Sequence, residues 1–248
     1  MPAAAVYLLD ADPDLADVLD ADTLAQARPY AVARVGEAAV GPWDPLGAHA
    51  PEATDLGLLV LDGVVSREVH VADRSAIEVL GDGDLLRPWD PEHDALFATP
   101  TVTWTVLAEL RFAVLDARFA LVAARWPPLM SALMGRAVRR ARALTYHLAV
   151  TQITGVETRV AMALWEFAQR WGRVGPDGVT LDLRVTHEML ARLVGARRPS
   201  VTTALRKLAE EGRVTQDGPG RWLLHGEPPE PGATVEQALR SLDPPSAG

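Results

Sequence analysis

The stretch VTHEMLARLVGARRPSVTTALRKLAEEGRVTQDGPGRWLL, residues 185–224, predicts two short helices, a tight turn and a β-hairpin. Leu190, Leu193 and Val194 give the first helix an apolar face at helical spacing, and Gly195 permits a sharp turn that residues with a Cβ resist. In the second helix apolar residues recur every three or four positions, so one face packs inward. The polar residues left on its outer face are Arg198, Ser200, Thr202, Thr203 and Arg206. Side chains of these types can read base edges in a DNA groove.

The spacing within this stretch matches that of a helix-turn-helix unit. Counted from His187, the small residue expected at the fifth position is Ala191 and the turn glycine expected at the ninth is Gly195. The β-branched core residue expected at the fifteenth position is Val201. Thr186 is the expected N-cap of the first helix, because its hydroxyl can accept from an unpaired backbone amide. The segment VTQDGPGRWLL predicts two strands around a Gly-rich turn, which would make the unit winged. The alternative is a helical hairpin with no nucleic-acid role.

The charge is distributed unevenly along the chain, whose formal net charge is −9. Residues 1–127 hold 21 Asp and Glu against 8 Arg, whereas residues 128–248 hold 16 Lys and Arg against 12 Asp and Glu. Residues 186–225 hold 7 basic against 4 acidic residues. Because local positive surface attracts phosphate, the acidic total does not argue against nucleic-acid binding.

Composition excludes several classes of protein and site. The 248 residues are 48% hydrophobic, which is ample for packed cores, and no segment approaches the ~18 apolar residues of a membrane span. The acidic, alanine-rich start lacks a secretory signal, so we expect a cytoplasmic protein with no membrane partner. The absence of cysteine excludes disulfides and thiolate metal sites, and six scattered histidines predict no metal and no cofactor. Phosphate loops and nucleophile motifs are absent, so we do not expect an enzyme.

The front half is predicted to be rich in β-strands. Residues 1–30 give no clear assignment. From Tyr30 to Leu115, short runs of Val, Leu, Ile and Thr are broken by Gly, Pro and Asp, which predicts a barrel or sandwich of antiparallel strands. Asp62-Gly63 and Gly81-Asp82-Gly83-Asp84 have the composition of turns between such strands.

Helical periodicity begins after Leu115. A short helical run ends at Pro127-Pro128, where a longer helix can start and continue to about Ile153. Its apolar seam is Leu129, Leu133, Ala137, Ala141, Leu144 and Leu148. A seam of this kind suits pairing with a second copy of the helix, although packing within the chain is the alternative. A further amphipathic helix runs from Val156 to Trp171, and GRVGPDGV, residues 172–179, predicts a turn-rich break.

The order of these parts resembles the Crp/Fnr transcription regulators. The resemblance covers about Val32 to Leu224 and rests on GLLVLDGVV, LGDGDLL, the long helix, THEMLARLVGARRPSVTTALRKL and the wing GRWLL. It implies an α+β chain that begins with a double-stranded β-helix, or jelly-roll, similar to cyclic-nucleotide-binding domains. The expected parts are a sensor-like domain at 1–127, a dimerisation helix at 128–154 and a winged helix-turn-helix domain at 155–226. Residues 227–248 lie beyond the resemblance, and their proline-rich composition predicts a flexible tail. The implied partners are double-stranded DNA and a second copy of the chain, with RNA polymerase as a further candidate.

The resemblance also assigns the DNA-binding residues. The family's first guanine-reading arginine falls on Arg198, whereas its usual glutamate is Pro199 here and its later arginine is Thr203. We expect base contacts from Arg198, Ser200, Thr202 and Thr203. We expect phosphate contacts or positioning from Thr186, Arg197, Arg206 and the wing residue Arg221.

The sensor half lacks the family's cyclic-nucleotide motif. The sequence Gly83-Asp84-Leu85-Leu86-Arg87-Pro88 places Arg87 and Pro88 where cyclic-nucleotide binders have Gly-Glu. No Lys or Arg follows between Arg87 and Arg111, so a phosphate would lack its counter-charge and cyclic AMP is not expected to bind. Arg74-Ser75 mimics the phosphate motif but precedes the Gly-Asp turn, so we interpret it as strand or turn surface. The effector is unknown.

Three alternatives stay open. A haem sensor would need an axial histidine, for which His49, His70 and His93 are available, although no spacing favours one of them. The winged helix could contact a protein in a ligand-binding or signalling module. The β-rich domain could also hold a small-molecule enzyme.

Overall fold

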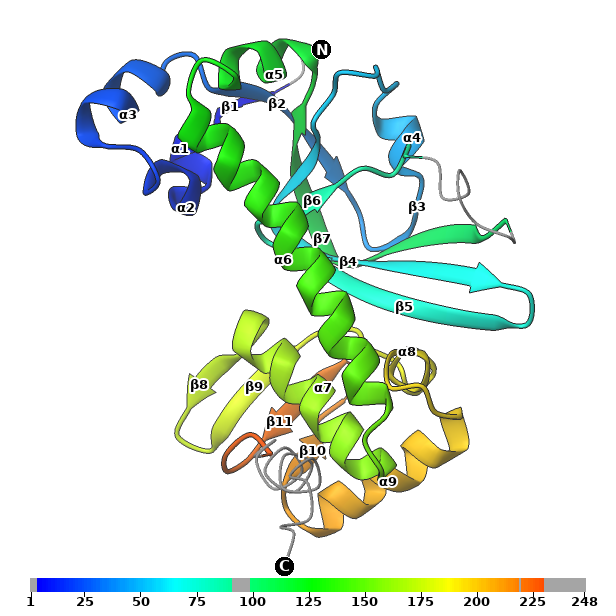
Figure 1. Ribbon diagram of the computed structural model, residues 1–248. Helices are drawn as coiled ribbons and strands as arrows, with labels where there is room; N and C mark the ends of the chain where they lie inside the picture. Colours follow the sequence, from blue (N-terminus) through cyan, green and yellow to red (C-terminus); the bar gives the residue numbers. More distant parts are fainter. Residues whose placement is uncertain (1–3, 91–98, 219, 230–248) are drawn as a thin grey trace, which may run out of the picture. The chain divides into compact units, whose positions relative to one another are not determined.

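The computed structural model describes residues 4–90, 99–218 and 220–229 (Figure 1). The described residues form two compact units, one within residues 4–149 together with 183–185 and the other within residues 150–182 and 186–229. Of the predicted tail at 227–248, all but the first three residues lie outside the described ranges.

The first unit is built on an antiparallel sheet. Its strands are β1 (Ala5–Tyr7), β2 (Val32–Ala38), β3 (Gly41–Trp43), β4 (Gly57–Val71), β5 (Arg74–Gly81), β6 (Leu85–Leu86) and β7 (Thr101–Leu115). The strand order is β1-β2-β7-β4-β5, with β3 paired to β7 and β6 paired to β4. Figure 1 shows β4 and β5 as one long hairpin. The prediction of a β-rich front half is confirmed, and Arg74-Ser75 begins β5 as expected.

One predicted turn is wrong. Asp62-Gly63 lies inside the 15-residue strand β4, at a β-bulge where its register with β7 shifts. Gly63 has φ +95°, and a Cβ there would lie 2.0 Å from the carbonyl oxygen of Glu109. The residue types that signal a turn therefore serve a bulge that bends one continuous strand.

Aspartates start several helices of the first unit. These helices are α1 (Leu8–Ala11), α2 (Pro13–Ala16), α3 (Ala21–Ala27), α4 (Pro45–Ala48) and α5 (Ala117–Ala123). Asp12 accepts the backbone amide of Leu15, and Asp20 accepts that of Thr23. Asp116 caps α5 in the same way. Some of the aspartates in residues 1–30, a segment that the sequence pattern left unassigned, are therefore helix N-caps.

The second unit combines helices with a small sheet. Its elements are α7 (Val156–Trp171), β8 (Arg173–Gly175), β9 (Gly178–Asp182), α8 (His187–Leu193), α9 (Arg198–Glu210), β10 (Val214–Gln216) and β11 (Arg221–Leu224). The sheet order is β10-β11-β9-β8, so the wing strands β10 and β11 are half of a four-stranded sheet. The turn-rich break predicted at residues 172–179 is instead the β8–β9 hairpin.

The long helix α6 spans Pro127–Thr151, close to the predicted range of 128–153. The predicted α+β fold class, with a strand-rich front, a long helix and a winged helix-turn-helix, is confirmed. Within the described ranges, no helix combines the length and apolar character needed to cross a membrane.

Candidate nucleic-acid interface

Local hydrogen bonds define the two helices of the predicted reading unit. The hydroxyl of Thr186 accepts the backbone amide of Met189 at 3.2 Å, which confirms the N-cap. Gly195 has φ +60°, a conformation that favours glycine, so the predicted turn glycine is also confirmed. Ala191 on α8 and Val201 on α9 are 2% and 0% exposed, and the two helices contact each other. The sequence therefore fixes the outward face of α9 by burying the opposite one.

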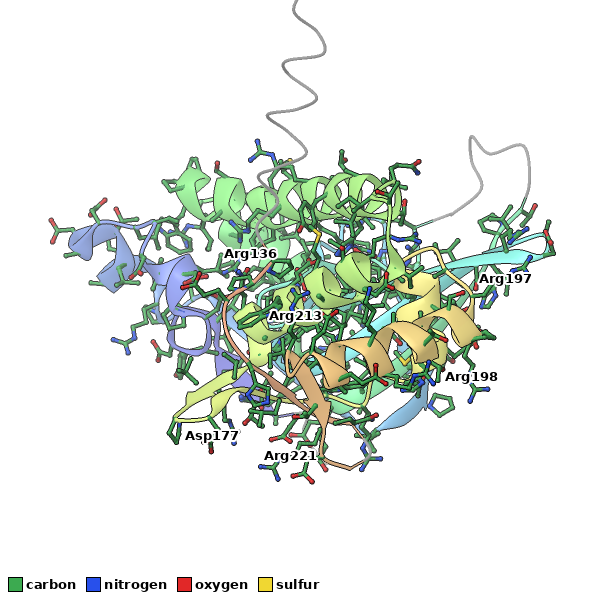
Figure 2. All side chains as sticks on the ribbon, turned by 90° about the horizontal axis from the view of Figure 1, so that it is seen from below. Arg136, Asp177, Arg197, Arg198, Arg213 and Arg221 are labelled. Atoms are coloured by element: carbon green, nitrogen blue, oxygen red, sulfur yellow. The ribbon has the colours of Figure 1, made fainter. Side chains whose placement is uncertain are left out.

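The amino-terminal end of α9 carries a concentrated positive charge. Arg197 is the N-cap residue and Arg198 the first helical residue, and the first turn holds no acidic side chain. Both arginines are exposed, as is Ser200. Figure 2 shows Arg197 and Arg198 projecting outward at this end of the helix. Because a helix N-terminus also presents unpaired amides and positive dipole charge, this end attracts anions such as phosphate.

The two threonines on the outer face of α9 are already engaged with their own helix. The hydroxyls of Thr202 and Thr203 donate to the carbonyl oxygens of Arg198 and Pro199, each at 3.1 Å. Thr202 also lies 3.0 Å from Nδ1 of His187. Thr203 therefore presents its methyl group and acceptor lone pairs outward, but not its hydroxyl hydrogen. Such a surface suits a thymine methyl or a base amino group.

The remaining predicted contacts lie in exposed ion pairs. Arg206 is 3.7 Å from Glu210, and the wing residue Arg221 is 3.6 Å from Asp182. All four side chains are more than half exposed, so the ion pairs contribute little free energy and a phosphate oxygen could replace either carboxylate. Figure 2 places Arg221 on the wing, separate from the two arginines of α9.

The predicted dimer seam on α6 mixes two faces of the helix. Leu129 and Leu133 are 0% and 2% exposed and belong to the core of the first unit, which corrects their assignment to the seam. Ala137, Ala141 and the later leucines are exposed. Each step of four residues advances about 40° around an α-helix, so three such steps carry the predicted seam from the buried face to the exposed one.

The structure separates these faces into two stripes. The buried stripe continues from the two leucines to Arg136 and Arg140, which form ion pairs with Asp12 and Glu78. The exposed stripe is Met134, Val138, Ala141, Thr145 and Leu148, with steps of four, three, four and three residues. This alternation is the spacing at which two helices pair along a heptad seam. Leu144 and Leu148 are 39% and 67% exposed, so the later part of the predicted seam remains accessible.

A cavity of about 320 Å³ lies beside this helix within the first unit. Its lining residues are Arg67, Leu85, Arg87, Asp90, Trp104, Ala137, Arg140, Ala141 and Leu144. The sequence predicts no counter-charge for a phosphate near the degenerate motif, because no Lys or Arg follows Arg87 closely. The structure differs, since Arg67 from β4 and Arg140 from α6 also line this cavity. Arg67 faces Glu78 across the β4–β5 hairpin. The pairing of Arg67 with Glu78 could be predicted from the sequence by folding β4 and β5 into a hairpin about the Ala72-Asp73 turn. The position of Arg140 could not, because it depends on the tertiary packing of α6.

The arginines of the cavity are held by acidic partners. Arg140 donates twice to the Glu78 carboxylate, at 2.7 Å each, and Arg67 lies 3.7 Å from the same carboxylate. Arg87 donates to both carboxylate oxygens of Asp90, at 2.7 and 2.9 Å. Arg87 also donates to the backbone carbonyl oxygens of Asp55 and Leu56. The guanidinium of Arg87 therefore holds the backbone at Asp55 and Leu56 in place.

The other residues of the degenerate motif shape the β5–β6 turn. The Asp84 carboxylate accepts the backbone amide of Gly81 at 2.8 Å. Gly83 has φ +77°, and a Cβ there would lie 2.1 Å from Nη1 of Arg136. Pro88 is half-buried and, as a proline, offers no backbone amide to a ligand.

The histidines named for a haem alternative have separate surroundings. Nε2 of His49 lies 2.6 Å from Asp55, and Arg34 lies 3.1 Å from its Nδ1, so both ring nitrogens have partners. Burial of Asp55 opposes its ionisation, but hydrogen bonds from the Glu52 amide and His49 outweigh it and lower the pKa of that carboxyl. His70 lies near Glu68 and Thr103, and His93 falls outside the described residues. No group of three or more potential metal ligands occurs among the residues described.

Comparisons with known proteins agree with this arrangement. Residues 158–225 match the Crp-like helix-turn-helix domain family. The chain is 32% identical, over 167 residues, to the CRP-like cAMP-activated global transcriptional regulator of Mycobacterium tuberculosis, spanning 62% of this chain and 71% of that protein. The structure of FixK2 from Bradyrhizobium japonicum superposes with a TM-score of 0.59 and 16% identity, covering 87% of this chain and 99% of FixK2.

A second solved structure shares the fold over nearly its full length. It is a cyclic nucleotide-binding domain containing protein from Listeria monocytogenes, with a TM-score of 0.59, 17% identity, and coverage of 88% of this chain and 97% of that one. The family model covers the reading unit, and the Mycobacterium relative extends the match well beyond it. This chain belongs to the Crp/Fnr family of transcriptional regulators.

Proposed function

We propose that this protein regulates transcription by binding a palindromic DNA site as a homodimer, with α9 of each copy in the major groove. The observation that carries the proposal is the amino-terminal end of α9, where Arg197 and Arg198 are exposed and no acid competes with phosphate. Arg198 and Ser200 are assigned to base edges together with Thr202 and Thr203. We assign phosphate contacts on the DNA backbone, or positioning of the reading unit, to Thr186, Arg197, Arg206 and Arg221.

The exposed stripe of α6 supports the homodimer. Met134 and Leu148 are 66% and 67% exposed, and Val138 is 45% exposed, although all three are large and apolar. The hydroxyl of Thr145 donates to the carbonyl of Ala141 at 3.1 Å, so Thr145 can turn its methyl group outward. Two copies of this stripe can bury each other because the steps between its residues match a heptad seam.

Selection of bound duplexes from a random pool tests the proposal. We expect an enriched palindrome whose half-sites lie about 10–10.5 base pairs apart, centre to centre, since two-fold related heads enter successive major grooves. We also expect guanine at the base pair facing Arg198 and no fixed guanine facing Thr203, because Thr203 offers a methyl group and an acceptor. Failure to enrich any sequence would instead favour a winged helix that contacts protein.

We further propose that cyclic AMP does not control DNA binding. The Mycobacterium relative is a cAMP-activated regulator, so independence from cyclic AMP would distinguish this protein from it. Glu78, 6% exposed, occupies Arg140 with two hydrogen bonds, while Asp90 occupies Arg87. An incoming phosphate would have to break charge-assisted pairs and lie beside their carboxylates.

Calorimetric titration with cyclic AMP checks this expectation. The wild-type protein should give no saturable heat, and its affinity for the selected duplex should not change when cyclic AMP is added. Glu78→Gln removes the competing charge beside Arg67 and Arg140, so that variant should gain affinity for the anion. Saturable binding of cyclic AMP to the wild-type protein, with tighter DNA binding, would overturn the proposal.

A further inference from the structure

Arg159, in the first turn of α7, donates hydrogen bonds to the carboxyl-terminal ends of α6 and α8. Its Nη1 donates to the carbonyl oxygen of Thr151, the last residue of α6, at 3.1 Å. The same atom donates to the carbonyl oxygens of Val194 at 2.6 Å and Gly195 at 3.3 Å, in the turn between α8 and α9. Because helix C-termini leave carbonyls unpaired and carry negative dipole charge, a guanidinium between them satisfies both ends.

The helix-turn-helix glycine is part of the same junction. A Cβ on Gly195 would lie 3.3 Å from Cβ and 3.4 Å from Cγ2 of Thr151, and 3.8 Å from Nη1 of Arg159. The turn of the reading unit therefore packs directly on the last residue of α6. Nε of Arg159 is buried without a hydrogen-bond partner among the described residues, so burial of this side chain carries a desolvation cost.

A second ion pair attaches α7 to α9. Glu157 lies 3.5 Å from Lys207, and the helix amide at Glu157 together with Lys207 lowers the pKa of that carboxyl. This pair is more exposed than Arg159 and does not involve α6. Arg159, in contrast, donates hydrogen bonds both to the end of α6 and to the α8–α9 turn.

We propose that Arg159 is a positioning residue that fixes the reading unit on the end of α6 and thereby sets the spacing of half-sites that the dimer accepts. This inference rests on the proposed DNA binding. Arg159 touches no base or phosphate in this assignment. Its loss should loosen the joint while leaving the base-reading surface of α9 unchanged.

The test compares Arg159→Met with Arg170→Met, the same substitution at an exposed position of α7 whose side chain stacks on Trp171. Each protein is titrated with duplexes that carry the selected half-sites at the optimal separation or displaced by one base pair. For Arg159→Met we expect the affinity ratio between the two duplexes to fall about tenfold, with unchanged half-site sequence preference. Arg159→Lys, which keeps a cation, should restore part of the ratio. An unchanged ratio in Arg159→Met would overturn the inference.

A measurement without DNA separates this inference from the proposed function. The chain has no cysteine, so spin labels can be attached at Ala149→Cys and Ala209→Cys, both exposed positions. Labelled protein diluted with an excess of unlabelled protein reports the intrachain distance between the last turn of α6 and α9. The distance distribution should broaden in Arg159→Met and stay narrow in Arg170→Met. If the wild-type protein selects no DNA, the proposed function fails. Independently, an unbroadened distance distribution in Arg159→Met would refute the role of Arg159 in fixing the reading unit on α6.

Discussion

A Val138→Glu, Leu148→Glu double variant should be monomeric and should lose most of its affinity for the selected palindrome. Both residues lie on the exposed stripe of α6, and pairing two copies would bring four carboxylates into an apolar seam. Burying unpaired charges in this way is far more costly than the seam can offset. Since two linked heads gain about 10²–10⁴ in avidity over one, we expect a loss of that order.

Sedimentation velocity and gel shifts with the selected duplex measure the two effects. Leu121→Glu is the matched control, because Leu121 is 76% exposed on α5 and lies off the α6 stripe. The control should remain dimeric and bind as tightly as wild type. Thermal unfolding of the double variant should still be cooperative, since neither replaced side chain is part of a core. A double variant that sediments as a dimer would show that the copies associate through another surface.

The sequence predicts the reading unit well because its signals are local. A turn glycine, an N-cap hydroxyl and the apolar spacing of α8 and α9 each act within a few residues, so Thr186 and Gly195 could be placed without tertiary information. The dimer seam was less predictable. Apolar residues on α6 serve both an intrachain core and an exposed stripe, and spacing by fours cannot tell Leu133 from Leu148.

The sensor half shows what local patterns miss. Arg140 and Glu78 are 62 residues apart, and their pairing follows only from the packing of α6 beside β5. Asp62-Gly63 has the composition of a turn but forms a bulge, because β7 continues to pair with β4 on both sides of it. Arg87 belongs to the degenerate motif itself, whereas Arg67 and Arg140 reach the same cavity from β4 and α6, so their positions in the sequence do not reveal them.

Arg198→Ala should change which sequence is bound more than how tightly DNA is bound in general. One bidentate arginine–guanine contact provides about 1–3 kcal/mol of discrimination, so the variant should lose preference at one base pair in each half-site. Its preferences elsewhere should persist, because Ser200 and Thr203 remain on the same exposed face. Titration of the selected duplex and of single-base variants, at several salt concentrations, gives both quantities.

Arg221→Ala is the informative contrast for this experiment. Arg221 lies on the wing beside Asp182, away from the first turn of α9, and is assigned to phosphate. Its removal should weaken binding to all sequences alike and reduce the slope of log affinity against log salt by about one unit for each protomer. Arg198→Ala should instead flatten one position of the recognised sequence. Equal selectivity in Arg198→Ala and the wild-type protein would remove Arg198 from base reading, and Ser200 would then be the next residue on that face to substitute.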